Sequence, residues 1–145
     1  MRTRAFQLLA VFIIGSGTIF GQDIPESQVP SVILNNFKKE FPKASDIEWE
    51  KKGDLYNVEF EIGWFTDYEA WFSSDGKLTR YTQDITDADF PKAIAKTIKS
   101  QYSAYRIDDV EKIVENGVET YKVELEKGHE EMDVLFSKDG KVIPF

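Results

Sequence analysis

The chain has 145 residues and carries 26 acidic against 18 basic side chains, a formal net charge of −8. It contains no cysteine, which excludes disulfides, thiolate nucleophiles and cysteine-ligated metals. An acidic surface argues against nucleic acid as a partner, because phosphate binding needs clustered Lys and Arg, but it suits basic proteins, cationic peptides or divalent cations.

Residues 1–21 have the pattern of a secretory signal peptide. Arg2 and Arg4 precede an apolar run, and small residues lead up to Gly21. Because the run is shorter than the ~20 apolar residues of a membrane-spanning helix, we expect cleavage before Gln22 and no membrane span in the mature chain. Loss of both arginines reduces the 18 basic residues to 16 against 26 acids, a net charge of −10. Export without disulfides favours a periplasmic or secreted protein of a bacterial envelope.

Residues 22–84 are expected to form a first unit of one helix and four strands. Apolar residues recur at helical spacing from Ile33 to Phe41, which predicts a helix that Ser27 or Ser31 caps and Pro42 ends. Alternation with period two then predicts a strand with one buried face over 55–62. The predicted strands of this unit are 47–51, 55–62, 68–72 and 78–84.

Residues 85–145 are expected to form a second unit of the same kind. Its helix begins near Asp89, a natural cap, with Pro91 in the first turn and Ile94 and Ile98 on the apolar stripe. The predicted strands of this unit are 110–114, 120–126, 132–136 and 141–145.

The two units look like copies of each other because three landmarks recur in the same order. We therefore predict an α+β fold of two tandem repeats, each one helix packed on a four-stranded antiparallel sheet. A unit of ~60 residues is marginal alone, so the copies should either share a core or, as we prefer, align their sheets into one longer surface. The landmark pairs are Val29-Pro30 and Phe90-Pro91, the segments 56–60 and 121–125, and the turns 72–77 and 136–141.

These residues resemble the PepSY-like, beta-lactamase-inhibitor-like proteins exported by Bacteroidetes. The shared features are a helix ending in Phe-Pro-x-Ala at 41–44, Trp49 in the next strand, a Tyr-x-Val-x-Phe strand at 56–60 and an Asp-Gly turn at 75–76. The second unit departs from the pattern, with Tyr102-Ser103-Ala104 at the helix end and Ile113 in place of the tryptophan. The resemblance implies two helix-plus-sheet repeats, a binding or inhibitory role and no catalytic residues. A shared fold does not transfer a particular target.

The predicted partner-binding residues follow from strand alternation. If Tyr56, Val58 and Phe60 face the helix, the opposite face of the sheet carries acids beside a tryptophan. Two more aromatic residues occupy the turn at 63–65. Such a surface suits an unidentified protein or peptide of basic or amphipathic character, because tryptophan often anchors interfaces. The alternative is a structural role, in which this tryptophan packs against the other copy or covers the sheet. The predicted site residues are Trp71, Glu59, Glu61, Glu69, Trp64 and Phe65.

Two other functions compete with this one. A hydrolase using two carboxylates needs acids in different environments, which an open sheet face does not provide. His129 lies in a predicted turn with no nucleophile spaced to it, so we predict no enzyme. A calcium-binding or calcium-regulated periplasmic protein is the alternative, with weak candidate ligands Asp84, Asp87 and Asp89 and a second acidic cluster at 130–133. Neither cluster has the spacing of an EF-hand loop, and helix capping also explains acids near residue 89.

Overall fold

The structure, a computed structural model, describes residues 21–86 and 89–144. The predicted signal peptide therefore lies outside the described residues, except Gly21, and so does Asp87. Within the described ranges, no helix is long and apolar enough to cross a membrane.

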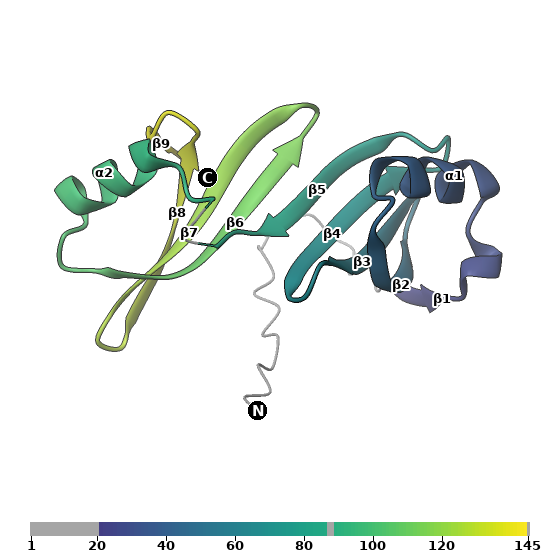
Figure 1. The fold of residues 1–145 in the computed structure, drawn as a ribbon, viewed down its shortest axis with the longest axis horizontal. Helices are drawn as coiled ribbons and strands as arrows, with labels where there is room; N and C mark the ends of the chain where they lie inside the picture. The colour runs from purple at the N-terminus through teal and green to yellow at the C-terminus, as the bar shows by residue number, and fades with distance from the viewer. Residues whose placement is uncertain (1–20, 87–88, 145) are drawn as a thin grey trace.

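The described residues form one antiparallel sheet whose strands lie side by side in chain order (Figure 1). Two α-helices and one short 3-10 helix accompany it: η1 (Glu26–Gln28), α1 (Ser31–Glu40) and α2 (Lys92–Gln101). The strands are β1 (Gln22–Ile24), β2 (Ala44–Lys52), β3 (Leu55–Ile62), β4 (Thr66–Ser73), β5 (Leu78–Asp84), β6 (Arg106–Glu115), β7 (Val118–Lys127), β8 (Glu130–Ser137) and β9 (Val142–Ile143).

The predicted fold of two four-stranded sheets, each with its own helix, is wrong. The last strand of the first half, β5, pairs with the first strand of the second half, β6, from Arg80 opposite Glu115 to Asp84 opposite Glu111. The strand β1 extends the sheet further, so the described strands make a single nine-stranded sheet. The physical reason is the cost of edges: separate sheets would leave the backbone N–H and C=O groups of β5 and β6 without partners. Pairing of β5 with β6 satisfies the backbone groups along both edges and joins the two halves into one longer sheet surface.

Both helices cover the same face of this sheet. Ala70 lies opposite Tyr81, and Tyr81 lies opposite Val114, so these side chains point to one side. Alternation along β6 places Val110 on that side as well. The helix-covered face holds two hydrophobic clusters, one between α1 and the strands β2–β5 and the other between α2 and the strands β6–β8. The opposite, helix-free face is open.

The helices bury the stripes that the sequence predicts. Ile33 and Phe37 of α1 and Ile94 and Ile98 of α2 are buried. The predicted caps are wrong: the N-cap positions are Pro30 and Pro91, and no side chain caps either helix. Proline is tolerated at a helix start because the first amides lack intrahelical acceptors. Ser27, Ser31 and Asp89 therefore do not provide the caps, and burial of the apolar stripe stabilises these ten-residue helices.

The two Asp-Gly turns fasten the helices to the sheet. Asn36 of α1 donates a hydrogen bond from Nδ2 to the carbonyl of Gly76 at 2.8 Å, and Thr97 of α2 donates from Oγ1 to the carbonyl of Gly140 at 2.8 Å. Both glycines have positive φ, 89° and 84°. A Cβ at Gly140 would lie 2.6 Å from the carbonyl oxygen of Ala93. The turn thus touches helix backbone, and only glycine fits the space.

We expect Gly140→Ala to destabilise the fold more than Gly117→Ala. Gly117 also has positive φ, 79°, but a Cβ there would meet no atom within 4 Å. The control should cost about 1–2 kcal/mol from the left-handed backbone alone. Gly140→Ala should cost about 1–3 kcal/mol more, because the turn and α2 must separate. Urea unfolding of both variants measures the difference, and equal losses would show that the turn does not hold α2.

Candidate interaction surface

A groove lined by carboxylates crosses the helix-free face. In the register of β3 and β4, Glu59 lies opposite Glu69 and Glu61 lies opposite Asp67. These residues border a cavity of about 340 Å³ that extends from β2 to β6, which we call the acidic groove. Of the described residues that line it, none is basic. The lining residues are Asp46, Glu48, Glu59, Phe60, Glu61, Asp67, Tyr68, Glu69, Thr82, Asp84 and Glu111.

The acidic groove depends on the continuous sheet. Asp84 comes from β5 and Glu111 from β6, and the two are paired partners across the junction of the two halves. Sequence analysis placed Glu59, Glu61 and Glu69 on this face but missed the contribution of Glu111. Only the β5–β6 pairing brings Glu111 beside the acids of the first half. Strand alternation could have placed the acid Glu111 on the helix-free face. The sequence does not show that its strand lies next to β5.

A polar network closes one end of the groove. The buried Asn57 accepts a hydrogen bond from Lys52 Nζ at 3.0 Å and donates from Nδ2 to Glu69 Oε1 at 2.9 Å. It also donates to the carbonyl of Ala70 at 3.3 Å, so its amide is well partnered. Lys52 lies 2.7 Å from Glu50 as well. The network fixes the position of Glu69 and places the Lys52 ammonium 3.9 Å from it, while the Lys122 ammonium lies 3.6 Å from Glu111.

Burial raises the pKa of two groove carboxyls. For Glu69, burial is the largest cause, and the hydrogen bond from Asn57 partly opposes it. For Glu59, burial again comes first, and repulsion by Glu50 adds to it. Both pKa values move in the same direction, whereas the paired carboxyls of a two-acid hydrolase have pKa values that their environments push apart. The crowded acids instead form a site whose negative charge favours a cation.

We expect the folded protein to gain stability as the pH falls from about 7 toward about 5, the opposite of ordinary acid destabilisation. In the folded chain the pKa values of Glu59 and Glu69 lie above the ordinary glutamate value of 4.5, so the folded chain takes up these protons first. Their stabilising contribution is full below the unfolded pKa and disappears as the pH rises through the folded pKa. Glu69→Gln should reduce the gain, and Glu40→Gln, on the exposed surface of α1, should not. Urea unfolding at both pH values would contradict this if stability fell.

Trp71 has a different environment from the predicted one. It lies on the helix-free face, as alternation requires, opposite Asn57 on one side and Arg80 on the other. The Arg80 guanidinium stands over its ring at 4.9 Å from the centroid, a cation–π contact. Trp71 is therefore half-buried beneath a cation rather than surrounded by acids alone. It stays partly accessible on the face that carries the acidic groove.

The two aromatics of the β3–β4 turn are the most exposed large apolar residues of the described chain. Trp64 is 87% exposed and Phe65 is 89% exposed. The turn follows directly on the pair Glu61 and Asp67, because Ile62 and Thr66 close the hairpin. An exposed aromatic tip thus adjoins one end of the acidic groove. Large exposed apolar side chains beside a polar rim are typical of interaction sites.

The proposed calcium ligands are not gathered in one place. Asp84 lines the acidic groove, whereas Asp89 lies in the linker, where its backbone amide donates to the carbonyl of Thr86 at 3.0 Å. Within residues 21–86 and 89–144, no three His, Asp or Glu side chains are placed to hold a metal ion. Glu130 instead accepts a hydrogen bond from the hydroxyl of Tyr105 at 2.8 Å. Calcium binding stays a prediction.

Comparison with known proteins assigns the chain to a family. The family model described as "Putative beta-lactamase-inhibitor-like, PepSY-like" matches residues 20–65 and 54–144. Among curated proteins, no sequence matches the chain.

Several solved structures share the fold. A BLIP-like protein from Bacteroides fragilis is 23% identical, with a TM-score of 0.70 over 83% of this chain and 85% of that one. A DUF2874 family protein from Bacteroides ovatus is 16% identical, with a TM-score of 0.71 over 85% and 87%. A Bacteroides eggerthii structure, described as "putative periplasmic proteins", is 20% identical, with a TM-score of 0.70 over 80% and 86%. At these identities the likeness shows the fold alone, while the family match covers most of the sequence: the chain belongs to the PepSY-like, beta-lactamase-inhibitor-like family.

Proposed function

We propose that this chain is an exported, non-catalytic binding module that engages a basic or amphipathic protein or peptide through the helix-free face of its sheet. The observation that carries the proposal is the acidic groove, whose described lining residues include eight carboxylates and no basic side chain. Charge complementarity of this kind speeds association and selects against acidic partners. The exposed Trp64 and Phe65 supply apolar area next to it.

An inhibitory role is the finer form of this proposal. The family description names a likeness to beta-lactamase inhibitors, and an inhibitor needs a rigid surface that fits its target. The nine-stranded sheet of the described residues supplies such a surface because the strands β3 to β8 each pair with a neighbour on both sides. The groove and the aromatic tip are the part of that surface with distinctive chemistry. A shared fold does not identify the target enzyme.

The test is capture from an envelope extract with the mature chain, residues 22–145. The groove variant Glu61→Gln with Asp67→Asn removes two charges from the lining. The matched control, Glu40→Gln with Asp54→Asn, removes the same charge from exposed positions outside the groove. We expect the parent and the control to capture the same basic protein and the groove variant to lose it. Equal capture by all three would exclude the groove as the binding surface.

The export part of the proposal makes its own prediction. If residues 1–21 are a cleaved signal peptide, the protein isolated from its native cells should begin at or close to Gln22. The Bacteroides eggerthii structure, whose description includes the word periplasmic, supports export of this chain. Intact-mass spectrometry measures the N-terminus directly. Recovery of a membrane-embedded chain that still begins at Met1 would contradict the prediction.

A further inference from the structure

The outer edge of β2 is only partly covered. The strand β1 pairs with β2 at three positions, Gln22 opposite Lys51, Asp23 opposite Glu50 and Ile24 opposite Trp49. Pro25 follows and has no backbone N–H, and the chain turns away into η1, where the amide of Gln28 donates to the carbonyl of Pro25. In the part of the chain that the structure describes, no strand pairs with the outer edge of residues 44–48.

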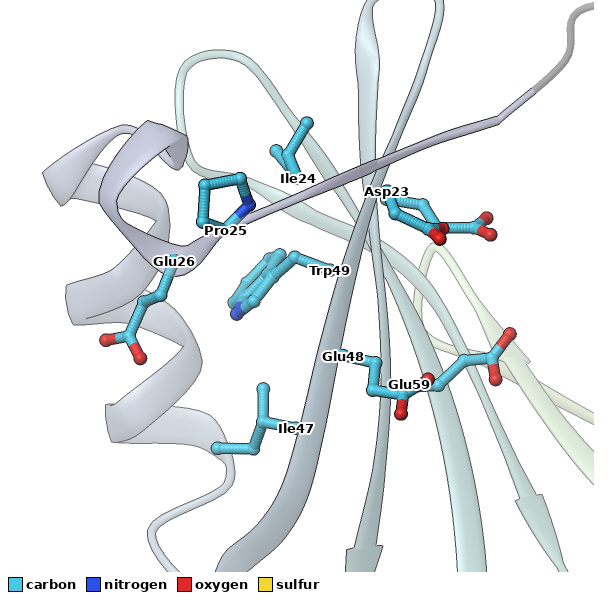
Figure 2. Close-up of a pocket in the computed structure, with 9 residues that line it drawn as sticks. Asp23, Ile24, Pro25, Glu26, Ile47, Glu48, Trp49 and Glu59 are labelled. Atoms are coloured by element: carbon cyan, nitrogen blue, oxygen red, sulfur yellow. The ribbon is translucent and has the colours of Figure 1, made fainter.

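A cavity of about 370 Å³ lies where β1 leaves this edge, and we call it the edge notch. Figure 2 shows that it is bordered on both sides of β2: Pro25, Ile47 and the Trp49 ring lie toward α1, and Glu48 and Glu59 lie on the other side. The edge notch thus joins an apolar wall to a cluster of acids. Its lining residues are Asp23, Ile24, Pro25, Glu26, Ile47, Glu48, Trp49, Glu50 and Glu59, none of them basic.

An unpartnered donor points into the edge notch. Trp49 is only 4% exposed, and its indole Nε1 is buried without a hydrogen-bond partner. In Figure 2 the nitrogen lies on the side of the ring that faces the gap between Glu26 and Ile47. A buried donor without an acceptor costs free energy, which is why such groups are rare in folded proteins. The buried amide of Asn57 shows the usual solution, with partners on both of its polar atoms.

We propose that the edge notch docks an extended peptide segment carrying a Lys or Arg side chain. The segment adds to the free edge of β2 in line with β1, and one of its carbonyls accepts the hydrogen bond from Trp49 Nε1. By strand alternation its basic residue points to the side of Glu48 and Glu59, and the neighbouring residues of the segment point toward Ile47 and Pro25. Strand addition of this kind takes its affinity from backbone hydrogen bonds and its specificity from such side-chain contacts.

Three further observations restrict the occupant. The β2–β3 register shifts between Ser45 and Glu48, and Asp46 has a φ of +49°, so the edge bends and accepts only a short segment. The pKa of Glu59 is raised first by burial and then by repulsion from neighbouring acids, which a cation would relieve. A second copy of this chain is disfavoured, because a chain with a net charge of −8 repels itself. The edge notch shares Glu48 and Glu59 with the acidic groove but does not depend on its function.

The experiment is an NMR titration of the ¹⁵N-labelled mature chain with a capped Thr-Val-Lys-Val-Thr peptide. A peptide with Glu in place of Lys is the matched control. The Trp49 indole signal is assigned with Trp49→Phe, which keeps an aromatic ring at this position and removes the donor. We expect the Lys peptide to shift this signal downfield in a saturable way and the Glu peptide to leave it in place. Trp49→Phe should weaken binding about tenfold, the loss of one hydrogen bond.

Glu48→Lys keeps the proposal testable if Trp49→Phe does not fold, because Glu48 is an exposed residue. It should also weaken binding of the Lys peptide about tenfold, whereas the groove variant Glu61→Gln with Asp67→Asn should bind normally. The absence of a saturable shift, or equal shifts with the Glu peptide, would overturn the proposal. So would an indole signal that moves with protein concentration alone, since a second copy would then be the occupant. If the groove variant alone lost the peptide, the ligand would belong to the groove.

Discussion

Replacing Phe37 with Ala is expected to lower the free energy of unfolding by about 3–5 kcal/mol. Phe37 is 1% exposed and lies at the centre of the aromatic cluster between α1 and the sheet. Its ring centroid is 5.0 Å from that of Phe60 and 5.2 Å from that of Trp49, both in edge-to-face arrangements. The substitution removes these contacts and leaves a cavity, because the sheet beneath is held by strand pairing and cannot collapse into the space.

Ile98→Ala and Lys39→Ala are the comparisons for this result. Ile98 is the corresponding buried residue of α2, and its loss should cost about 2–5 kcal/mol. Lys39 is exposed on α1, and its loss should stay within about 0.5 kcal/mol. Urea unfolding of the mature chain measures all three. Losses below about 0.5 kcal/mol at both Phe37 and Ile98, the size typical of surface sites, would show that the helices do not pack as described.

Trp71→Ala is expected to weaken binding of the captured partner by about 2 kcal/mol or more, roughly a thirtyfold loss of affinity. Trp71 lies between Asn57 and Arg80 on the helix-free face, and Arg80 limits its motion through the cation–π contact. A half-buried, immobile aromatic side chain loses little conformational freedom on binding, which is a property of interface anchors. The loss of folding stability should be smaller than for Phe37→Ala, because Trp71 lies outside both hydrophobic clusters.

Trp64→Ala is the matched test of the other aromatic position. If Trp64→Ala loses the partner and Trp71→Ala keeps it, the anchor is the β3–β4 turn. Charge reversal at Glu59 and Glu69 should slow association, and the effect should shrink as salt rises, because salt screens the long-range attraction of an approaching partner over about 10 Å at 0.1 M. Surface plasmon resonance with the captured protein separates these effects. A Trp71→Ala chain that no longer folds would instead assign this residue to the structure of the sheet.

The sequence by itself determined the local elements and their buried sides. The stripe of Ile33 and Phe37 has the period of a helix, and the alternation over 55–62 has the period of a strand, so each element carries its own pattern. The order of motifs was enough to indicate the family that the comparison then showed. The helix and strand patterns depend on residues close together in the sequence, and the motif order can be read along the chain, which is why both can be recognised without coordinates. The caps were mistaken because Ser and Asp near a helix start commonly cap it, whereas here Pro30 and Pro91 occupy the N-cap positions and no side chain caps either helix.

Only the tertiary structure decided how the strands are ordered across the two halves. The pairing of Asp84 with Glu111 joins residues from separate halves, and no local pattern records which edge a strand will choose. That pairing makes one sheet, places Glu111 in the acidic groove and creates the long helix-free face. The end of β1 at Pro25 likewise decides that the β2 edge stays open beside Trp49. Strand pairing is set by the need to satisfy backbone groups over the whole sheet, so its outcome depends on residues far apart in the sequence.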